Sequence, residues 1–237
     1  MILYEKPFRI ELLGRTLLKD GEEWPFVTRR VSDLKEVLME PQNAGPEGIA
    51  YYMFRGIHQW ENLRYDITLI ESRFYGDEYA KTLGHYHPPS PVSGIQFPEV
   101  YQVLRGDAAF VLQRKHRDEA VDCIFIEAKE KDAFIVPPGY GHVTFNKSGG
   151  PLILGNVVAN FDSIYDEFLA NHGGAFFCTR FGYKQNAYYI VKKYEKLTPR
   201  QINKRYGLMF GDILDMFYSK PEKFEFLEHP EKLPVFP

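Results

Sequence analysis

Short apolar or aromatic runs between residues 48 and 158 limit the fold of this chain more than any other feature. Turn residues such as Gly76, Gly106 and Pro137 separate these runs, and no helical stretch lies between them. Short strands that recur roughly every ten residues are typical of an antiparallel sandwich or small barrel. The middle of the chain is therefore predicted to be all-β. The expected strands are Gly48 to Phe54, Asp66 to Phe74, Glu99 to Leu104, Ala108 to Gln113, Val121 to Glu127, Ala133 to Val136 and Leu152 to Val158.

Helical signals lie on either side of this region. Ser32 stands where it can cap a short helix that runs through Leu38. Asp162 or Ser163 is placed to begin a second helix that ends near Gly173. Short peripheral helices are therefore expected beside the strands.

Residues 198–237 differ in character from the rest of the chain. Thr198 and Pro199 suit the N-cap and the first position of a helix. Apolar residues then recur at helical spacing, and several prolines end any long helix. Because the apolar side chains are costly to leave in water, we expect a helical and extended appendage that packs on a domain of residues 1–197. The spacing is that of Ile202, Tyr206, Met209 and Phe210, and the prolines are Pro221, Pro230, Pro234 and Pro237.

Composition excludes several classes of function. Hydrophobic residues make up 44% of the 237 residues, which is enough for a packed core. The 29 basic and 32 acidic side chains leave a net charge of -3, so no bulk cationic surface is available for a nucleic acid. No segment approaches 18 apolar residues without a charge, so no membrane span is expected.

The cysteines and the N-terminus both favour a cytoplasmic protein. Cys123 and Cys178 belong to no C-x-x-C pair, and we expect both to be buried thiols in a reducing compartment. Charged residues interrupt the first twelve positions, where a signal peptide would need an unbroken apolar stretch. Cytoplasmic residence is therefore the expectation.

Three of the seven histidines form a pattern with one glutamate. His85 and His87 are separated by one residue, a spacing that on a β-strand points both imidazoles to the same face. Glu99 begins the next expected strand, and His142 follows a turn that starts at Pro137. Three neutral imidazoles and one carboxylate suit a divalent transition ion, with one or two positions open for oxygen ligands. Fe(II), Mn(II), Ni(II), Co(II) and Zn(II) all accept such donors.

These residues occupy two stretches that resemble the two sequence motifs of the cupin superfamily. Glu99 and Gly106 stand at the E-x6-G spacing, and residues 137–146 match P-x-G-x-x-H-x3-N. Within the cupins, the chain resembles the archaeal type of the glucose-6-phosphate isomerase family. The likeness spans roughly residues 25 to 165 and is carried by Arg29 to Leu34, Thr82 to His87 with Glu99 to Tyr101, and Val136 to Asn146.

The resemblance implies a fold, a cofactor and a reaction. The fold is the cupin double-stranded β-helix, a jelly-roll barrel, with short peripheral helices and a C-terminal helical extension. One metal ion per subunit, Fe(II) first, would be held by His85, His87, Glu99 and His142. The reaction is the interconversion of glucose 6-phosphate and fructose 6-phosphate in glycolysis and gluconeogenesis, with Glu99 as the base. A homodimer that pairs through its N-terminal strands is also implied.

The sugar phosphate needs a receptor of its own, and the chain has no glycine-rich phosphate cradle. Scattered hydroxyls, backbone amides and a lysine are the groups expected to meet it, although Lys81 is expected to be exposed and without a role. The resemblance implies that Thr82, Gly84 and Thr68 meet the phosphate. Tyr51 and Tyr101 are expected to line the same cavity and complete the substrate-binding set.

Departures from the family pattern leave other functions open. Residues 88–94 form a Pro- and Ser-rich insertion beside the predicted metal, and Lys131 replaces a common glycine. Between Asn160 and Tyr165 only Tyr165 is clearly retained from the family's histidine and tyrosines. The alternatives are a cupin Fe(II) dioxygenase, an isomerase of another sugar such as mannose 6-phosphate or lyxose, and a sugar-binding cupin without catalysis. Whether a proton or a hydride moves is also open.

Overall fold

The computed structural model describes residues 1–234. Residues 235–237, which include Pro237 and the end of the expected appendage, lie outside the described residues. The strands are β1 (Ile2–Tyr4), β2 (Ile10–Leu13), β3 (Thr16–Lys19), β4 (Glu22–Glu23), β5 (Val27–Arg30), β6 (Ile49–Trp60), β7 (Leu63–Ile70), β8 (Phe74–Tyr75), β9 (Glu78–Tyr79), β10 (Glu99–Arg105), β11 (Asp107–Lys115), β12 (Val121–Lys129), β13 (Ala133–Val136), β14 (Gly141–Asn146), β15 (Leu152–Ala159), β16 (Phe176–Thr179), β17 (Gly182–Gln185) and β18 (Val191–Leu197). The α-helices are α1 (Val31–Leu34), α2 (Asp166–Ala170), α3 (Pro199–Arg205) and α4 (Ile213–Ser219), and the 3₁₀ helices are η1 (Lys35–Val37), η2 (Pro41–Asn43), η3 (Pro221–Leu227) and η4 (Pro230–Lys232).

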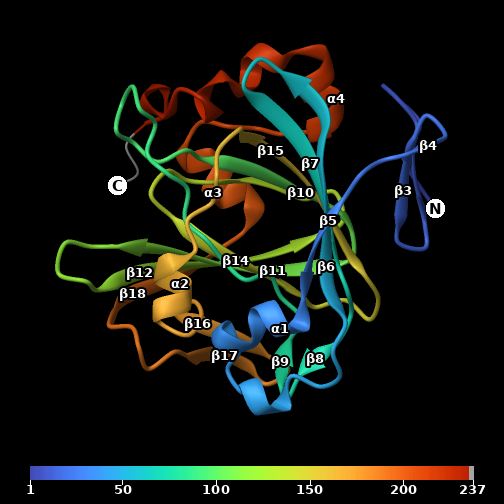
Figure 1. Cartoon of the computed structure of the whole chain (residues 1–237). Helices are drawn as coiled ribbons and strands as arrows, with labels where there is room; N and C mark the ends of the chain where they lie inside the picture. The colour runs from blue at the N-terminus through green and yellow to red at the C-terminus, as the bar shows by residue number, and fades with distance from the viewer. Residues whose placement is uncertain (235–237) are drawn as a thin grey trace.

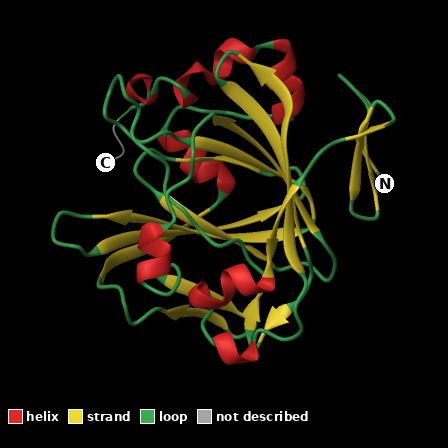
Figure 2. Ribbon diagram, viewed as in Figure 1, coloured by secondary structure: helices red, strands yellow, loops and turns green. Residues whose placement is uncertain are grey.

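Two main sheets face each other across the core (Figures 1 and 2). One has six strands in the order β13-β10-β15-β7-β6-β5, and the other has four in the order β14-β11-β12-β18. Two further small sheets lie at the periphery, β1-β2-β3-β4 and β17-β16-β9-β8. The predicted all-β fold with peripheral helices is confirmed, since the core is built from two facing antiparallel-rich sheets and the helices lie outside them.

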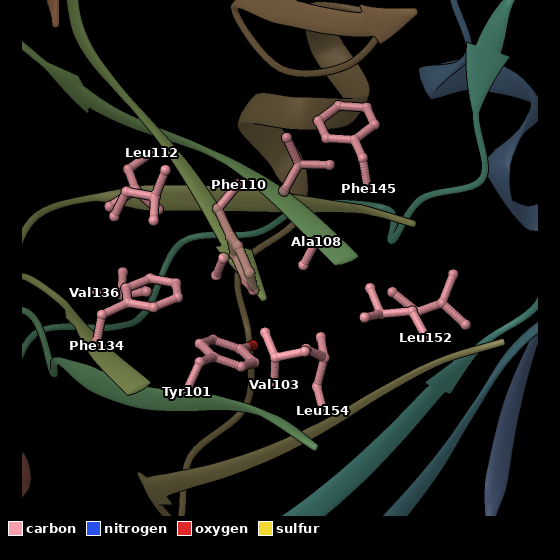
Figure 3. Close-up of a cluster of buried hydrophobic side chains, with 14 of the residues drawn as sticks. Tyr101, Val103, Ala108, Phe110, Leu112, Phe134, Val136, Phe145, Leu152 and Leu154 are labelled. Atoms are coloured by element: carbon pink, nitrogen blue, oxygen red, sulfur yellow. The ribbon is translucent and has the colours of Figure 1, made fainter. Parts of the chain in front are cut away.

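Alternating side chains on the facing strands fill one part of the interior with apolar groups (Figure 3). The ring of Phe110 on β11 lies 5.3 Å from that of Tyr101 on β10 and 4.8 Å from that of Phe134 on β13, measured between centroids. Because side chains on a strand alternate between faces, Glu99 shares its face of β10 with Tyr101 and Val103. The apolar core therefore adjoins the polar part of the interior directly.

The six-stranded sheet is covered on both faces. All eight residues of β15 are buried, which requires packing on each side of the strand. On the outside, the Tyr4 hydroxyl of the N-terminal sheet lies 3.1 Å from that of Tyr65 on β7. The C-terminal helices lie against the same sheet, α3 beside β13 and α4 beside β15 (Figure 1).

The C-terminal segment begins as its sequence predicts. The Thr198 hydroxyl accepts a hydrogen bond from the backbone N–H of Gln201 at 3.2 Å, and Pro199 takes the first helical position. The helix then ends at Arg205, and Gly207 follows with a φ of +65°. The prediction that the helical pattern continues through Met209 and Phe210 is therefore wrong beyond Arg205. Met209 is 88% exposed.

The two other expected helices begin at residues different from those predicted. Arg30, not Ser32, is the N-cap of α1, because the Asp33 carboxylate accepts the Arg30 backbone N–H at 2.7 Å. Neither Asp162 nor Ser163 starts α2. Ile164 is still extended, since it exchanges backbone hydrogen bonds of 2.8 and 2.9 Å with Tyr86, and the helix follows only after Tyr165.

Strand boundaries and one lysine also differ from expectation. The strand predicted over Asp66 to Phe74 runs instead from Leu63 to Ile70, where it pairs with β15 and β6. Lys81 is buried rather than exposed, with 1% of its surface accessible, and its ammonium lies 3.0 Å from the Glu78 carboxylate. A local pattern does not reveal that a long polar side chain meets a buried partner. Within residues 1–234, no helix is both long enough and apolar enough to cross a membrane.

Candidate metal centre

Four side chains from three separate stretches of the chain converge at one end of the barrel interior. His85 and His87 follow β9, Glu99 begins β10 and His142 lies near the start of β14. One donor atom of each residue lies within 4.8 Å of the donor atoms of the other three. Backbone hydrogen bonds of 3.1 and 2.9 Å join His85 to His142. The motif that contains His85 and the motif that contains His142 are therefore paired through their backbones at the site. The four residues predicted as a cluster are thus brought together.

The donor atoms that meet are the Nε2 atoms of the histidines and Oε2 of the glutamate. Nε2 of His87 lies 3.2 Å from Nε2 of His85 and 3.2 Å from Oε2 of Glu99. Nε2 of His142 lies 3.4 Å from the same carboxylate oxygen. His87, Glu99 and His142 are buried, whereas His85 is partly accessible from the adjoining pocket.

Outer contacts orient two of these groups in the way that a metal requires. Nδ1 of His87 lies 2.7 Å from the Phe97 carbonyl oxygen, which can only accept, so Nδ1 carries the proton and Nε2 presents its lone pair. The Asn156 amide donates to Oε1 of Glu99 at 2.7 Å. Oε2 of Glu99 is buried with no hydrogen-bond donor in the described part of the chain. A cation would neutralise this carboxylate oxygen, which has no hydrogen-bond donor. The three histidines and Glu99 therefore fit a divalent metal ion.

Burial also keeps the site in the protonation state that metal binding needs. It lowers the pKa of both His85 and His142 well below the ordinary value of 6.5, and the neighbouring imidazoles add to the effect. Their neutral forms are the metal-binding forms. Burial, followed by the nearby Glu99 carboxylate, raises the pKa of Tyr101 well above 10, so its hydroxyl keeps its proton. That hydroxyl lies 3.2 Å from Nε2 of His142.

A pocket that is partly open to solvent adjoins the cluster, and His85, His87 and Glu99 form part of its wall. Its wall contains all five residues expected to bind substrate, Tyr51, Thr68, Thr82, Gly84 and Tyr101. Gly84 has a φ of +88°, and a Cβ there would come within 2.5 Å of the Phe168 ring, so no larger residue fits without rearrangement.

Sequence reasoning missed several residues of this wall. Asn156 and Asp66 lie on neighbouring strands in direct register, and both face the pocket. Their alternation with apolar neighbours was a usable signal, since a polar residue inside a buried strand needs a partner. Arg55 and Arg64 also line the pocket, although no arginine was predicted there.

The segment that departs from the family pattern forms part of the same wall. Phe161, Ser163 and Tyr165, which belong to the segment 160–165, all line the pocket. Of these three residues, only Tyr165 matches the family pattern of a histidine and tyrosines. The Phe161 ring lies 4.6 Å from the His87 ring and stacks on Phe97 at 5.3 Å. An aromatic surface therefore covers one side of the cluster.

The insertion at residues 88–94 folds as a closed loop beside the cluster. Backbone hydrogen bonds of 2.8 Å link Ser90 to Ile95 and Gly94 to Ser90, and Phe97 donates to Pro88 at 3.1 Å. The loop therefore holds Phe97, whose carbonyl orients His87.

A family model named glucose-6-phosphate isomerase (GPI) matches residues 28–201, which include the barrel strands and all four clustered residues. The chain belongs to the GPI family. Among curated protein sequences, none matches this GPI-family chain.

Solved structures also show similarity, at low identity. Peruvianin-I, a cysteine peptidase from Thevetia peruviana latex, is 14% identical over 46% of this chain and 60% of that chain, with a TM-score of 0.34. A recombinant oxalate oxidase in complex with glycolate is 12% identical over 46% of this chain and 50% of that one, with a TM-score of 0.34. A cupin domain of an XRE family transcriptional regulator from Enterobacter cloacae is 10% identical over 48% of this chain and 99% of its own length, with a TM-score of 0.33. The family assignment therefore depends on the match over residues 28–201.

Proposed function

We propose that this protein is a metal-dependent aldose-ketose isomerase of the archaeal, cupin type, which interconverts glucose 6-phosphate and fructose 6-phosphate in glycolysis and gluconeogenesis. The observation that carries the proposal is the cluster of three histidines and Glu99 at the wall of a pocket in a GPI-family chain. A single small molecule in that pocket can reach both the cluster and the hydroxyl groups around it.

One divalent ion per subunit is proposed at His85, His87, Glu99 and His142, with Fe(II) first and Mn(II), Zn(II), Ni(II) or Co(II) as substitutes. Three imidazole nitrogens and one carboxylate oxygen support an ion of this class, and they do not select among its members. When bound, such an ion polarises the oxygens on C1 and C2 of the sugar as a Lewis acid.

Glu99 is the proposed base. Its carboxylate would take the proton from one of the two carbons and return it to the other, so that the reaction consumes no net proton. The Asn156 amide holds Oε1 in place, which restricts the direction in which the carboxylate can act. Tyr101 keeps its proton beside Glu99 and can donate a hydrogen bond to a sugar oxygen. In D₂O this route predicts deuterium in the product, whereas a direct hydride shift predicts none.

The other pocket residues are proposed to hold the substrate. The hydroxyls of Tyr51, Thr68 and Thr82 can each donate to a sugar or phosphate oxygen. The backbone at Gly84 lies close to the pocket because no side chain intervenes. These groups are the proposed substrate-binding set together with Tyr101.

A cytoplasmic homodimer is part of the proposal. Apolar residues are exposed on and beside the N-terminal strands, including Ile2 at 45%, Leu13 at 57% and Val27 at 51%. A second copy that pairs through these strands would cover them. Cys123 and Cys178 are free and buried, as a reducing compartment permits.

The test is turnover of fructose 6-phosphate by the purified protein without oxygen, after chelation and after reloading with each metal. We expect glucose 6-phosphate to form, chelation to abolish the activity and one of the metals to restore it. Glu99→Gln should lose activity, and Glu222→Gln, at an exposed site in η3, should keep it. Oxygen uptake with an enediol substrate would instead indicate the dioxygenase, and sugar binding without product in any metal form would refute catalysis. A panel with mannose 6-phosphate and lyxose tests the other sugars.

A further inference from the structure

Two arginines on the wall of the pocket differ in whether their charge is neutralised. Nε of Arg64 lies 2.9 Å from the Asp66 carboxylate, and its Nη1 donates to Asn160 at 2.6 Å. Arg55 lines the same pocket but forms no ion pair with any residue from 1 to 234, and its nearest side-chain partner is the sulfur of Met53 at 3.7 Å. Arg55 is therefore a free cation at the pocket, whereas Arg64 is not.

A bulge in β6 places Arg55 there. The pairing register between β6 and β7 shifts between Phe54 and His58, and Gly56 within the bulge has a φ of +68°. Bulges of this kind redirect a side chain and are common beside active sites. The Gly56 backbone N–H donates to Oδ1 of Asp66 at 2.7 Å. Because Oδ2 of Asp66 already accepts from Arg64, both oxygens of this pocket carboxylate are engaged by other donors.

A second uncompensated cation lies behind the aromatic wall. Arg29 on β5 is opposite Tyr51 on β6, and its guanidinium is 5.2 Å from the centre of the Tyr165 ring. Nε of Arg29 is buried without a hydrogen-bond partner, and Arg29 forms no ion pair within the described residues. Arg29 does not itself line the pocket, but it is opposite Tyr51 and its guanidinium lies against the Tyr165 ring, and both tyrosines line the pocket.

Arg55 is exposed to solvent and Arg29 is partly buried, so the Arg55 guanidinium is hydrated in the free protein and available to an anion that enters the pocket. Guanidinium binds phosphate through two parallel N–H donors, a geometry that no lysine offers. We propose that Arg55 binds the phosphate monoester of the substrate directly, in addition to the hydroxyls and backbone at Thr68, Thr82 and Gly84, with Arg29 as a second positive charge that positions it. The inference rests on the proposed function for the sugar-phosphate class, and it makes Arg55 the residue that selects phosphorylated over free sugars.

Calorimetric binding to the full-length protein as purified tests the proposal without turnover. The ligands are glucitol 6-phosphate, which has no carbonyl to isomerise, together with glucitol and inorganic phosphate. The wild type should bind glucitol 6-phosphate more tightly than either other ligand. Arg55→Gln should weaken glucitol 6-phosphate binding about 10- to 100-fold, as loss of a charge-assisted pair does, with little change for glucitol. Arg55→Lys should recover part of the lost affinity, because lysine restores the positive charge but not the two parallel N–H donors of the guanidinium.

Arg117→Gln is the matched control, since Arg117 is exposed at the turn between β11 and β12. It should bind all three ligands as the wild type does. Arg29→Gln should weaken the phosphate ester less than Arg55→Gln, and Arg29→Lys tests whether any loss reflects charge or folding. Equal affinity of Arg55→Gln and wild type for glucitol 6-phosphate, with an unchanged melting temperature, overturns the proposal.

The outcomes also separate this inference from the proposed function. Isomerase activity that survives Arg55→Gln with an unchanged KM refutes the phosphate receptor and leaves the isomerase standing. Arg55-dependent binding of glucitol 6-phosphate by a protein that never isomerises a sugar phosphate supports the receptor and refutes the isomerase.

Discussion

Replacing Glu99 by glutamine should change stability in opposite directions with and without metal. Without metal, Oε2 of Glu99 is buried beside two imidazole nitrogens and receives no hydrogen bond from the described residues. In Glu99→Gln the amide oxygen can still accept from Asn156, while the new NH₂ group can donate to the Nε2 lone pairs of His87 and His142. Because an unsatisfied buried polar group costs about 1–3 kcal/mol, the metal-free variant should be more stable than the wild type by that amount.

The metal-bound comparison should reverse this order. Loss of an outer-shell partner already costs roughly 10- to 100-fold in metal affinity, and loss of the carboxylate ligand should cost more. A metal present at about 1,000 times its dissociation constant stabilises the wild type by about 4 kcal/mol, most of which the variant would lose.

Thermal unfolding of both proteins in chelator and in saturating metal measures the two effects. For a chain of this size, each kcal/mol corresponds to about 2–4 °C, so the two melting curves should exchange order when metal is added. Glu222→Gln, at an exposed site, should follow the wild type in both conditions. A metal-free Glu99→Gln protein that melts below the wild type would refute the reasoning, because it would show that the carboxylate is satisfied without a cation.

Three further predictions test the surroundings of the site and the appended helices. Asn156→Leu removes the donor to Glu99 and should weaken metal binding about 10- to 100-fold in a competition titration with a chromophoric chelator; an unchanged affinity would mean that Asn156 does not orient the carboxylate. Phe217→Ala on α4, where the ring is fully buried, should lower the free energy of unfolding by about 3–5 kcal/mol in urea titrations, and a loss below 1 kcal/mol would show that α4 adds little to the core. The metal-free protein should lose stability as pH falls below 6.5, because burial lowers the pKa of His85 and His142, so the unfolded chain takes up protons that the folded chain excludes; a melting temperature that stays level from pH 7 to pH 5 would contradict this.

The insertion at residues 88–94, beside the four-residue cluster, shows why some features could not be predicted from the sequence. Its proline and serine content indicated a loop near the cluster, and the loop is indeed there. Its role depends on one backbone carbonyl, that of Phe97, which accepts from His87 across ten residues of chain. A backbone contact of this kind leaves no trace in residue type. The same holds for Lys81, whose burial beside Glu78 depends on the strands packed around both.

The sequence by itself determined the all-β barrel and the four residues of the cluster. Strand alternation is a local property, and the motif spacing marks His85, His87, Glu99 and His142 as one group whatever the rest of the wall contains. Only the tertiary structure decided which charges face the pocket unneutralised. Arg55 and Arg64 look alike in the sequence, and a bulge in β6 together with the two occupied oxygens of Asp66 makes one of them free and the other paired. Charge compensation is set by distances between strands, which no single stretch of residues encodes.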